Sequence, residues 1–357
     1  MKKFFLSLAI FVMALCANAQ TNQYFWYQGN LMMGNPIAQI DSVTFGEGEP
    51  ADTLHILLPR TIIKTVRETV YVTIHDTVCP NTIPEGALAG EFSVSTTKKV
   101  RFSKGNLQFN AAQGTHQCAD GTIKQGTWQF AEHQWDMIGN SNVNISSSYN
   151  GWIDLFGWGT SGWNSGANAY QPYSTSRYEG DYFPGGDYRN NLTGECANAD
   201  WGIYNSISNG GNVFGTWRTL TNDEWSYILV SRDNANTLYG QATVNGVHGL
   251  IILPDGWTPI LGIEFIPAYS STGWTVNTYT ESQWTQMEKG GAVFLPAGCG
   301  RRGQNIEYNN VGSYWSSTID DDWSDAKDIS FFMDHINTND DAGRDNGQSV
   351  RLVQDVE

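Results

Sequence analysis

Short apolar runs separated by turn-forming residues predict a small β module in residues 20–50. The run Tyr24–Tyr27 leads into Gln28-Gly29-Asn30 and returns through Leu31–Met33, which is the pattern of two strands joined by a turn. A later run, Asp41–Phe45, adds a further strand. We therefore expect three short strands in this region.

Apolar and polar residues alternate over Thr65–Val78, where every valine and the isoleucine fall on one parity. A period of two predicts an extended segment rather than a helix. We expect residues 51–86 to form a stalk-like linker, with a strand docked on the main domain as the alternative. Pro80 and Pro84 mark a boundary before a main domain of residues 87–357.

The main domain opens with short strand patterns, followed by a long polar stretch. Residues 140–212 are rich in Gly, Ser, Asn and Trp, which indicates packed loops whose aromatic side chains replace ordinary core. Together with the helices described next, this predicts an α+β fold of short antiparallel strands. The opening strands are expected at Phe92–Ser95, Val100–Phe102, Leu107–Phe109 and Trp128–Phe130.

Two capping boxes predict two short helices. In the first, the Thr221 hydroxyl and the Glu224 carboxylate can each bond the other residue's backbone amide, with Leu220 and Trp225 placed for a hydrophobic staple. This helix should run from Asn222 to about Ser231, and its cap explains Glu224 without a catalytic role.

The second box lies within Thr280–Gln283 and starts a helix that ends at Gly290-Gly291. Between the two helices, Gln241–Leu253 reads as a hairpin with Asn245-Gly246 at its turn. His248 lies in its second strand and is interpreted as an ordinary, half-buried residue.

The segment Gly291–Val353 carries the candidate site. Strand patterns at Ala292–Leu295, Tyr314–Ser317, Asp328–Met333 and Ser349–Val353 enclose two polar loops rich in Asp and Asn. A rigid frame with long polar loops is the usual layout of a binding surface. Four apolar residues are expected to hold the frame, namely Phe294, Trp315, Phe331 and Val350.

The first residues have the pattern of a secretory signal peptide, comprising residues 1–19. Lys2-Lys3 precedes a short apolar run, and Ala17-Asn18-Ala19 is a cleavage site; lipidation at Cys16 is the alternative. The apolar run is shorter than the ~20 residues that span a bilayer. We expect an exported protein, in the periplasm, at the cell surface or secreted, without a membrane span.

Composition limits the classes of partner that the protein can bind and the states that its cysteines can adopt. The formal charge of −16 argues against nucleic acid or an anionic membrane as the partner. Aromatic residues make up 13% and charged residues 16% of the chain, which fits short strands and aromatic packing. After the signal, Cys79, Cys118, Cys196 and Cys299 remain; an exported protein permits disulfides, and a Cys118–Cys196 bridge and free buried thiols are both open.

The order of these motifs resembles the Fibrobacter succinogenes major paralogous domain, a branch of the C-type-lectin-like fold that also includes formylglycine-generating and sulfatase-modifying enzymes. The resemblance rests on the helix motif at Arg218–Trp225, the YWSS string at Tyr314–Ser317 and the GQSVR string at Gly347–Arg351, and covers Ala87–Val353. It implies a C-type-lectin-like domain.

A closer resemblance is to exported Bacteroidetes members of this domain, some of them variable target proteins of diversity-generating retroelements. It implies that the segment between the FLPA and SVRLV strings is a ligand-binding surface for a glycan or a protein. The candidate contact residues are Tyr308, Asn309, Asn310, Asp320, Asp321, Asp322, Trp323, Asp325, His335, Asn337, Asn339, Asp340, Asp341, Arg344, Asp345 and Asn346.

Other chemistries are weighed against this binding role. The formylglycine-generating reaction needs two C-terminal cysteines, and only Cys299 is present there. A hydrolase needs a carboxylate pair or an activated nucleophile, and no spacing singles one out. Structural Ca²⁺ is the remaining cofactor alternative, with Asp320, Asp322 and Asp325 as candidate ligands. Trp315 is assigned to the core.

We therefore expect a non-enzymatic, exported binding protein. Alternatives are an enzyme on the same fold, acting on a polysaccharide or a protein side chain, and a structural subunit of a surface assembly in which Thr65–Val78 pairs with a partner's sheet. Arg351 is expected to pair with a loop carboxylate.

Overall fold

The protein divides into two units, residues 1–82 and 83–357, in a computed structural model. The structure describes residues 83–307, 310–322 and 324–356, together with four strands of the first unit. The second unit starts at Ile83, inside the stretch in which the sequence places the domain boundary. No helix within these described parts is long and apolar enough to cross a bilayer.

In the first unit, β1 (Asn22–Tyr27) pairs antiparallel with β2 (Asn30–Pro36), as the predicted strand–turn–strand pattern requires. Strands β3 (Lys64–Val66) and β4 (Thr69–Tyr71) also pair antiparallel. Both strands are extended rather than helical, and they lie beside each other in the ladder, with Thr65 the register partner of Val70. The signal peptide, Asp41–Phe45 and Cys79 lie outside the described residues.

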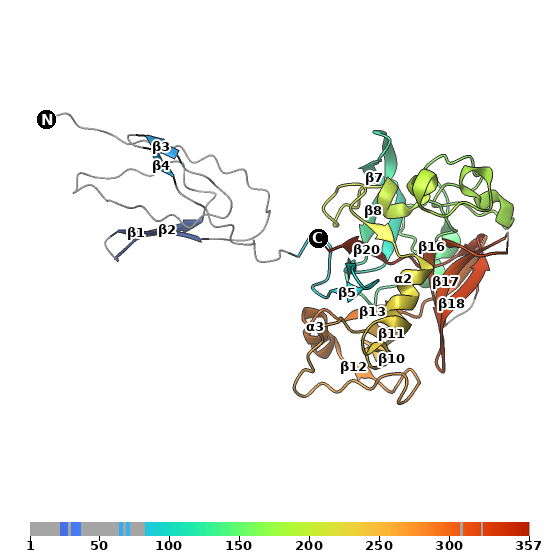
Figure 1. Cartoon of the computed structure of the whole chain (residues 1–357). Coiled ribbons are helices and arrows are strands. Elements are labelled where there is room, and N and C mark those ends of the chain that lie inside the picture. The colour runs from blue at the N-terminus through green and yellow to red at the C-terminus, as the bar shows by residue number, and fades with distance from the viewer. Residues whose placement is uncertain are drawn as a thin grey trace. The chain divides into compact units, whose positions relative to one another are not determined.

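The second unit has mixed α+β architecture with several small antiparallel sheets and few helices, which confirms the fold class at this level (Figure 1). Three α-helices are described: α1 (Trp201–Tyr204), α2 (Asn222–Ser226) and α3 (Glu281–Lys289). The strands up to the last third are β5 (Phe92–Ser93), β6 (Lys99–Phe102), β7 (Leu107–Gln117), β8 (Ile123–Phe130), β9 (Arg218–Thr219), β10 (Tyr239–Val244), β11 (Val247–Ile252) and β12 (Thr278–Tyr279).

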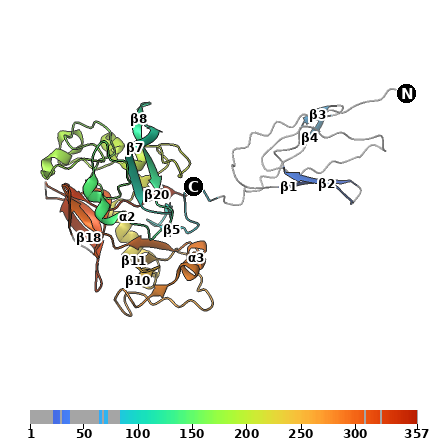
Figure 2. The same cartoon turned by 180° about the vertical axis from the view of Figure 1, so that it is seen from behind.

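The later strands belong to the segment that carries the candidate site. They are β13 (Val293–Pro296), β14 (Gly300–Arg302), β15 (Asn305–Glu307), β16 (Gly312–Ile319), β17 (Asp325–Phe331), β18 (Ile336–Gly343), β19 (Asn346–Gly347) and β20 (Leu352–Asp355). In both views, β16–β18 lie at one side of the unit, β10–β13 and α3 lie at its lower end, and the β7–β8 hairpin lies at its upper end (Figures 1 and 2).

Strand β20 lies inside a four-stranded sheet of order β5-β6-β20-β9. Val353 pairs with Phe102 of β6 and with Arg218 of β9, so β20 joins the start of the domain to its middle. The ladder begins at Leu352, whereas the sequence predicted a strand from Ser349. Ser349 instead makes an isolated parallel bridge to Tyr314, which ties the site segment to this sheet.

The predicted hairpin is present as β10 and β11. Asn245 has a φ of 49° and Gly246 a φ of 82°, the left-handed pair that a tight two-residue turn requires. Strands β12 and β13 flank the hairpin in the sheet β12-β10-β11-β13. Both capping boxes also form, with the Thr221 and Thr280 side chains accepting from the amides of Glu224 and Gln283.

Helix α2 continues into a wider π-helical turn, Tyr227–Ser231, so the helical region ends where the sequence predicts. Leu220, Trp225, Ile228 and Leu229 are buried in one hydrophobic cluster. The stapling pair is therefore confirmed, and Ile228 and Leu229 are buried together with it. This cluster also contains Phe331, so α2 packs beneath the strands of the candidate site.

The long Trp-rich stretch has little regular structure but is tightly packed. Trp158, Trp201 and Trp217 are fully buried and belong to a second hydrophobic cluster with Trp315. The indole of Trp158 donates to the Ser316 carbonyl at 2.8 Å, and that of Trp315 donates to the Phe156 carbonyl at 2.7 Å. Loop aromatics thus hold the site strands in place, and the assignment of Trp315 to the core is confirmed.

Cys118, Cys196 and Cys299 are free thiols. The proposed Cys118–Cys196 bridge was therefore wrong. The Cys118 thiol instead lies 3.8 Å from the Asn205 Oδ1 acceptor, and Cys118 and Cys196 are both buried.

Candidate ligand-binding site

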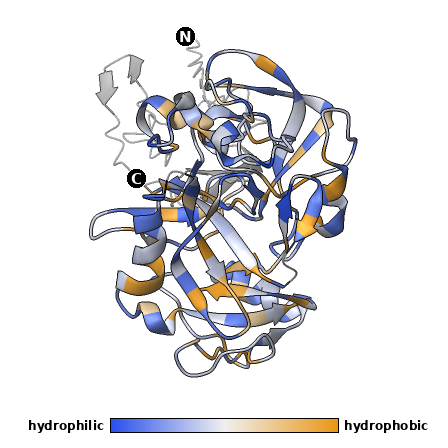
Figure 3. Cartoon of the chain, turned by 90° about the vertical axis from the view of Figure 1, so that its right-hand side faces the viewer, coloured by the Kyte–Doolittle hydropathy of each residue, from blue (hydrophilic) through white to orange (hydrophobic). Residues whose placement is uncertain are grey.

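Strands β16, β17 and β18 form a three-stranded antiparallel sheet with β17 in the centre. Figure 3 views the unit from the side where this sheet lies, and hydrophilic and hydrophobic residues are interspersed along its strands. Tyr314, Ile329 and Phe331 are fully buried under the sheet. Phe294, Trp315 and Val350 are fully buried as well, which confirms the predicted frame residues.

The second predicted polar loop is in fact a strand, β18. Asn337, Asn339 and Asp341 are exposed, whereas the residues between them are half-buried. Pairing with β17 imposes this alternation, because neighbouring side chains of a strand point to opposite faces. The loop prediction was wrong for these residues, yet the alternation still presents three of them to solvent.

Helix α2 supports β18. The Asn222 side chain donates to Asn339 Oδ1 at 2.9 Å, and the Ser226 hydroxyl donates to the Thr338 carbonyl at 3.3 Å. The capping-box helix therefore positions the strand that carries four of the candidate contact residues, Asn337, Asn339, Asp340 and Asp341.

The first polar loop, after β16, is held by local hydrogen bonds. Asp320 forms an ion pair with Lys327 and accepts from the Asp322 amide at 2.8 Å. Burial alone would raise the pKa of Asp320, but these two interactions outweigh it and leave the pKa below its usual value. Ser324 donates to Asp325 at 2.7 Å. Asp321 and Asp322 remain exposed.

Arg344 and Asp345 are buried, which corrects their assignment as contact residues. The Arg344 guanidinium lies between the rings of Trp158 and Phe183, 4.8 Å from each ring centre, and donates to the Tyr188 carbonyl at 2.6 Å. Burial lowers its pKa to about 10. These contacts anchor the turn after β18.

Asp345 accepts a hydrogen bond from Arg302 at 2.7 Å, and the same guanidinium donates to Glu179 at 2.9 Å. Burial raises the pKa of Asp345, and Arg302 acts in the opposite direction. Asp345 therefore fixes β14 rather than facing a ligand.

Arg351 does not pair with a loop carboxylate, so that expectation was wrong. Its guanidinium donates to the amide oxygens of Asn106 at 3.1 Å and Gln134 at 2.6 Å. The side chain is 1% exposed, and burial lowers its pKa to about 10. Neutral acceptors inside the core thus take the place of the expected carboxylate.

A pocket of about 370 Å³ opens on the polar face of the β16–β18 sheet, where that sheet meets β14 and β19. Its size falls within the range of small-ligand sites. Four of the predicted contact residues line it, and the sequence did not single out the others. The lining residues are Gly300, Arg301, Val311, Ser313, Asp325, Asp328, Ser330, Phe332, Asp340, Asp341, Ala342, Gly343, Asn346, Gly347 and Gln348.

Asp328 is the most unusual residue of this pocket. It is 2% exposed, and its Oδ1 atom has no hydrogen-bond partner within the described residues. Burial, followed by repulsion from Asp340, raises its pKa to about 8. A buried carboxylate oxygen without a hydrogen-bond partner is rare because its desolvation is uncompensated. Gln348 shares this property: it is 5% exposed, and its Oε1 atom is also unpartnered.

Asp340 lies directly across the ladder from Asp328. Its Oδ2 atom accepts a hydrogen bond from the Ser330 hydroxyl. The strand begins upstream of the predicted Asp328–Met333, so that Ala326, Asp328 and Ser330 share one parity of β17. An aspartate on the same face as the buried Ala326 needs a buried partner or a ligand.

The predicted contact residues fall into groups of different exposure. Asn310, Asp321, Asp322, His335, Asn337, Asn339 and Asp341 are exposed, whereas Asp320, Asp325, Asp340 and Asn346 are half-buried. Tyr308, Asn309 and Trp323 lie outside the described residues.

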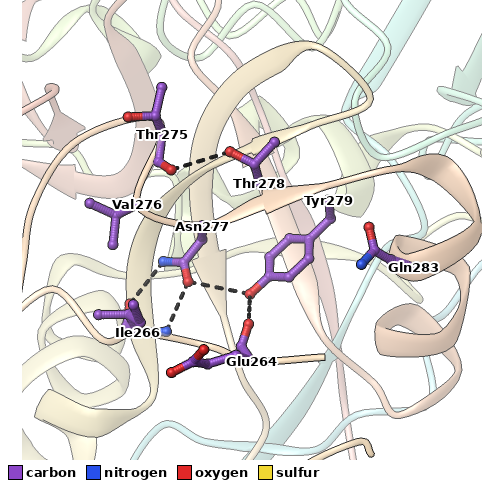
Figure 4. A pocket seen from close by; sticks show the side chains of 8 residues that line it. All are labelled: Glu264, Ile266, Thr275, Val276, Asn277, Thr278, Tyr279 and Gln283. Atoms are coloured by element: carbon purple, nitrogen blue, oxygen red, sulfur yellow. Dashed lines mark hydrogen bonds between the residues drawn. The ribbon is translucent and has the colours of Figure 1, made fainter. Parts of the chain in front are cut away.

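A second pocket, of about 300 Å³, lies near α3 (Figure 4). Asn277 accepts from the Ile266 amide and donates to the Gln241 and Ile266 carbonyls, and Tyr279 donates to the Glu264 carbonyl. Its buried polar groups are thus occupied in holding the loop. We assign this pocket a structural role.

Metal binding has little support from the side-chain geometry. No group of three or more His, Cys, Asp or Glu side chains suited to a metal occurs in the parts of the chain that the structure describes. Asp320 is engaged with Lys327, and Asp325 with Ser324. Structural Ca²⁺ at Asp320, Asp322 and Asp325 stays a prediction from the sequence.

Comparison with known proteins gave no match to a protein-family model, to a curated protein or to a solved structure.

Proposed function

We propose that this chain is a non-enzymatic, exported binding protein that recognises a glycan or protein ligand through the outer face of its β16–β18 sheet. One observation carries the proposal. A pocket of about 370 Å³ in this face contains two buried, unpartnered acceptor atoms, on Asp328 and Gln348. Buried polar atoms are normally satisfied, so a pocket that leaves two of them open is suited to a ligand that supplies donors.

The surroundings of the pocket support a recognition surface. Asp340 and Asp341 of β18 line the pocket, Asn337 is exposed on the same strand, and Asp321 and Asp322 lie in the loop between β16 and β17. The strands beneath them are anchored by fully buried aromatic residues, which keeps the surface rigid. A rigid surface loses little conformational entropy when it binds.

We further propose that the domain is C-type-lectin-like. The supporting features are the capping-box helix, the hairpin, the second capped helix and the final strand frame, which follow one another in the order of the family that the sequence resembles.

Thiol chemistry is poorly supported at Cys299. Burial, with an added contribution from Asp154, raises the pKa of its thiol to about 11, so the reactive thiolate is scarce near neutral pH. This favours binding over an oxidase reaction.

The test uses the full chain and arrays of glycans and of whole cells. Substituting Asp321, His335, Asn337 and Asp341 with alanine should abolish the binding that the unmodified protein shows. The matched control substitutes the exposed residues Glu264, Thr275 and Thr278 beside the second pocket and should leave binding intact. Equal binding by both variants would rule out the β16–β18 surface.

A second function is favoured by one specific observation, the carboxylate pair Asp328 and Asp340. A carboxyl group whose pKa is raised to about 8 can act as a general acid near neutral pH, with the neighbouring Asp340 side chain as its counterpart. This arrangement would suit an enzyme acting on a polysaccharide. Hydrolysis of a polysaccharide that disappears in Asp328→Asn would support it, whereas binding without turnover would favour the first proposal.

A further inference from the structure

The pocket beside β17 contains hydrogen-bond acceptors that have no donor among the described residues. Asp328 Oδ1 and Gln348 Oε1 are both acceptors, both are buried, and neither has a partner. A ligand that satisfies them while Asp328 is ionised must donate hydrogen bonds. Water alone would serve two acceptors, but it would leave the carboxylate charge uncompensated.

The charged side chains that line the pocket are mostly acidic. The carboxylates of Asp325, Asp328, Asp340 and Asp341 line it, and Arg301 is the only basic lining residue among those described. Arg301 is 1% exposed, and its guanidinium donates to the backbone carbonyls of Leu155, Ser174 and Gly303.

The nearby Lys327 does not line the pocket and forms an ion pair with Asp320. Its amino group lies 3.9 Å from Asp341, so it offsets part of that one charge. The Asp328–Asp340 pair consequently has no cation bonded to it among the described side chains. Two carboxylates held together in this way attract a positive group.

We propose that this pocket binds a protonated nitrogen group, a primary ammonium or a guanidinium. The proposal rests on the function proposed above and specifies the chemistry of its ligand. The N–H groups would donate to Asp328 Oδ1 and Gln348 Oε1, and Asp340 would supply a second negative charge. Charge-assisted hydrogen bonds of this kind are about twice as strong as neutral ones.

The donor set suits an organic cation better than a divalent metal. Ca²⁺ takes about six to eight oxygen ligands, and the described residues contain no group of three metal-binding side chains. An ammonium has three N–H donors and a guanidinium five, so two or three well-placed acceptors satisfy the first and engage one edge of the second. An anionic ligand would meet like charge from the aspartates that line the pocket.

Binding should depend on pH. Burial, together with Asp340 and Asp341, raises the pKa of Asp328, while the Gln348 side chain and Lys327 act in the opposite direction. A cation binds the ionised form, so affinity should increase as the pH rises toward 8. Bound cation should in turn lower the pKa of Asp328.

The test is titration of the full chain by calorimetry and amide NMR with three small probes of similar shape. Butylguanidinium and butylammonium carry the charge, and butylurea is the neutral match. We expect the cations to bind at least about tenfold more tightly than butylurea and to shift the amide signals of β17 and β18. Equal binding of butylurea, or binding of Ca²⁺ alone, would overturn the proposal.

Variants connect the binding to the site. Asp328→Asn keeps the shape but removes the charge, and should weaken butylguanidinium binding by roughly tenfold or more. Gln348→Met should weaken it by a smaller factor. The control Asp233→Asn changes the net charge equally at an exposed side chain outside the pocket and should leave binding unchanged. If Asp328→Asn bound as tightly as the unmodified protein, the site assignment would be wrong.

A further titration distinguishes a cation that belongs to a protein side chain from a free small cation. Tighter binding of a Gly-Arg-Gly peptide than of butylguanidinium would identify a protein side chain, and equal binding would identify a free small cation; either result supports the proposal. Array binding that depends on the outer surface, without cation binding, would overturn this inference and leave the proposed function standing. If the probe cations bind but no glycan or cell on the arrays does, this inference stands and the proposed function is overturned.

Discussion

Asp328 of β17 and Asp340 of β18 are register partners in an antiparallel ladder, and the Ser330 hydroxyl donates to Asp340. The ladder thus places two like charges side by side, one of them almost without contact with water. Such a pair costs folding free energy whenever both groups are ionised.

The stability of the protein should therefore depend on the ionisation of Asp328. Its folded-state pKa of about 8 lies above the unfolded value, so the folded state retains a proton that the unfolded state loses. The free energy of unfolding should fall as the pH rises from about 4 to 8, by at most about 1.4 kcal/mol per pH unit. Asp328→Asn should remove this component.

Urea unfolding at pH 5 and at pH 8 measures the effect. The gain in stability from Asp328→Asn should be larger at pH 8, while Asp233→Asn, an exposed control, should show no such difference. A gain of the same size at both pH values would mean that Asp328 is ionised throughout.

The cap of α2 should be stronger than that of α3. Glu224 accepts from the Thr221 amide at 2.9 Å and from both terminal nitrogens of Arg218, at 2.7 and 2.8 Å. Glu224→Ala should lower the free energy of unfolding by about 2–3 kcal/mol, because a cap and a charged pair are lost together. Gln283→Ala, in an exposed box, should cost about 1 kcal/mol. Thermal unfolding with equal losses would contradict this order.

The described cysteines should react as separate thiols. Cys118 and Cys196 are buried, so iodoacetamide should modify them only after unfolding. Cys299 should react faster as the pH rises toward its pKa of about 11, roughly tenfold per unit, because only the thiolate is reactive. Mass spectrometry without reductant checks the prediction, and a linked Cys118–Cys196 peptide would refute it.

The hairpin turn at Gly246 provides a test of backbone strain alone. A Cβ atom added there meets nothing within 4 Å, but the φ of 82° is unfavourable for alanine. Gly246→Ala should therefore cost about 1 kcal/mol. Gly256→Ala is the control, since its surroundings are equally open and its φ is not in the left-handed region. Comparable stability of the two variants would show that the turn relaxes.

Local structural features were predicted correctly because they depend only on residues that are close together in the sequence. The Thr221–Glu224 capping box and the Asn245-Gly246 turn are each complete within four residues. The α+β class followed from such elements. The pocket did not, because Asp328 and Gln348 come together only after β14, β16 and β19 have been arranged around β17.

The errors also have physical causes. Asn337–Asp341 has the composition of a loop, and pairing with β17 overrides that preference. The polar sequence around Arg344 predicts an exposed side chain. In the structure, its guanidinium packs against Trp158 and Phe183, which lie far upstream in the chain. Burial of this kind is set by tertiary packing and leaves no local pattern.

The position of β20 determines which mutations in the preceding surface segment the fold can tolerate. The strand that joins β6 to β9 is encoded after the whole surface segment. A frameshift or stop codon within that segment would remove the strand and leave Phe102 and Thr219 without their partners. An in-frame exchange of an exposed residue such as Asn337 leaves β20 and its two ladders in place, whereas loss of the reading frame removes them.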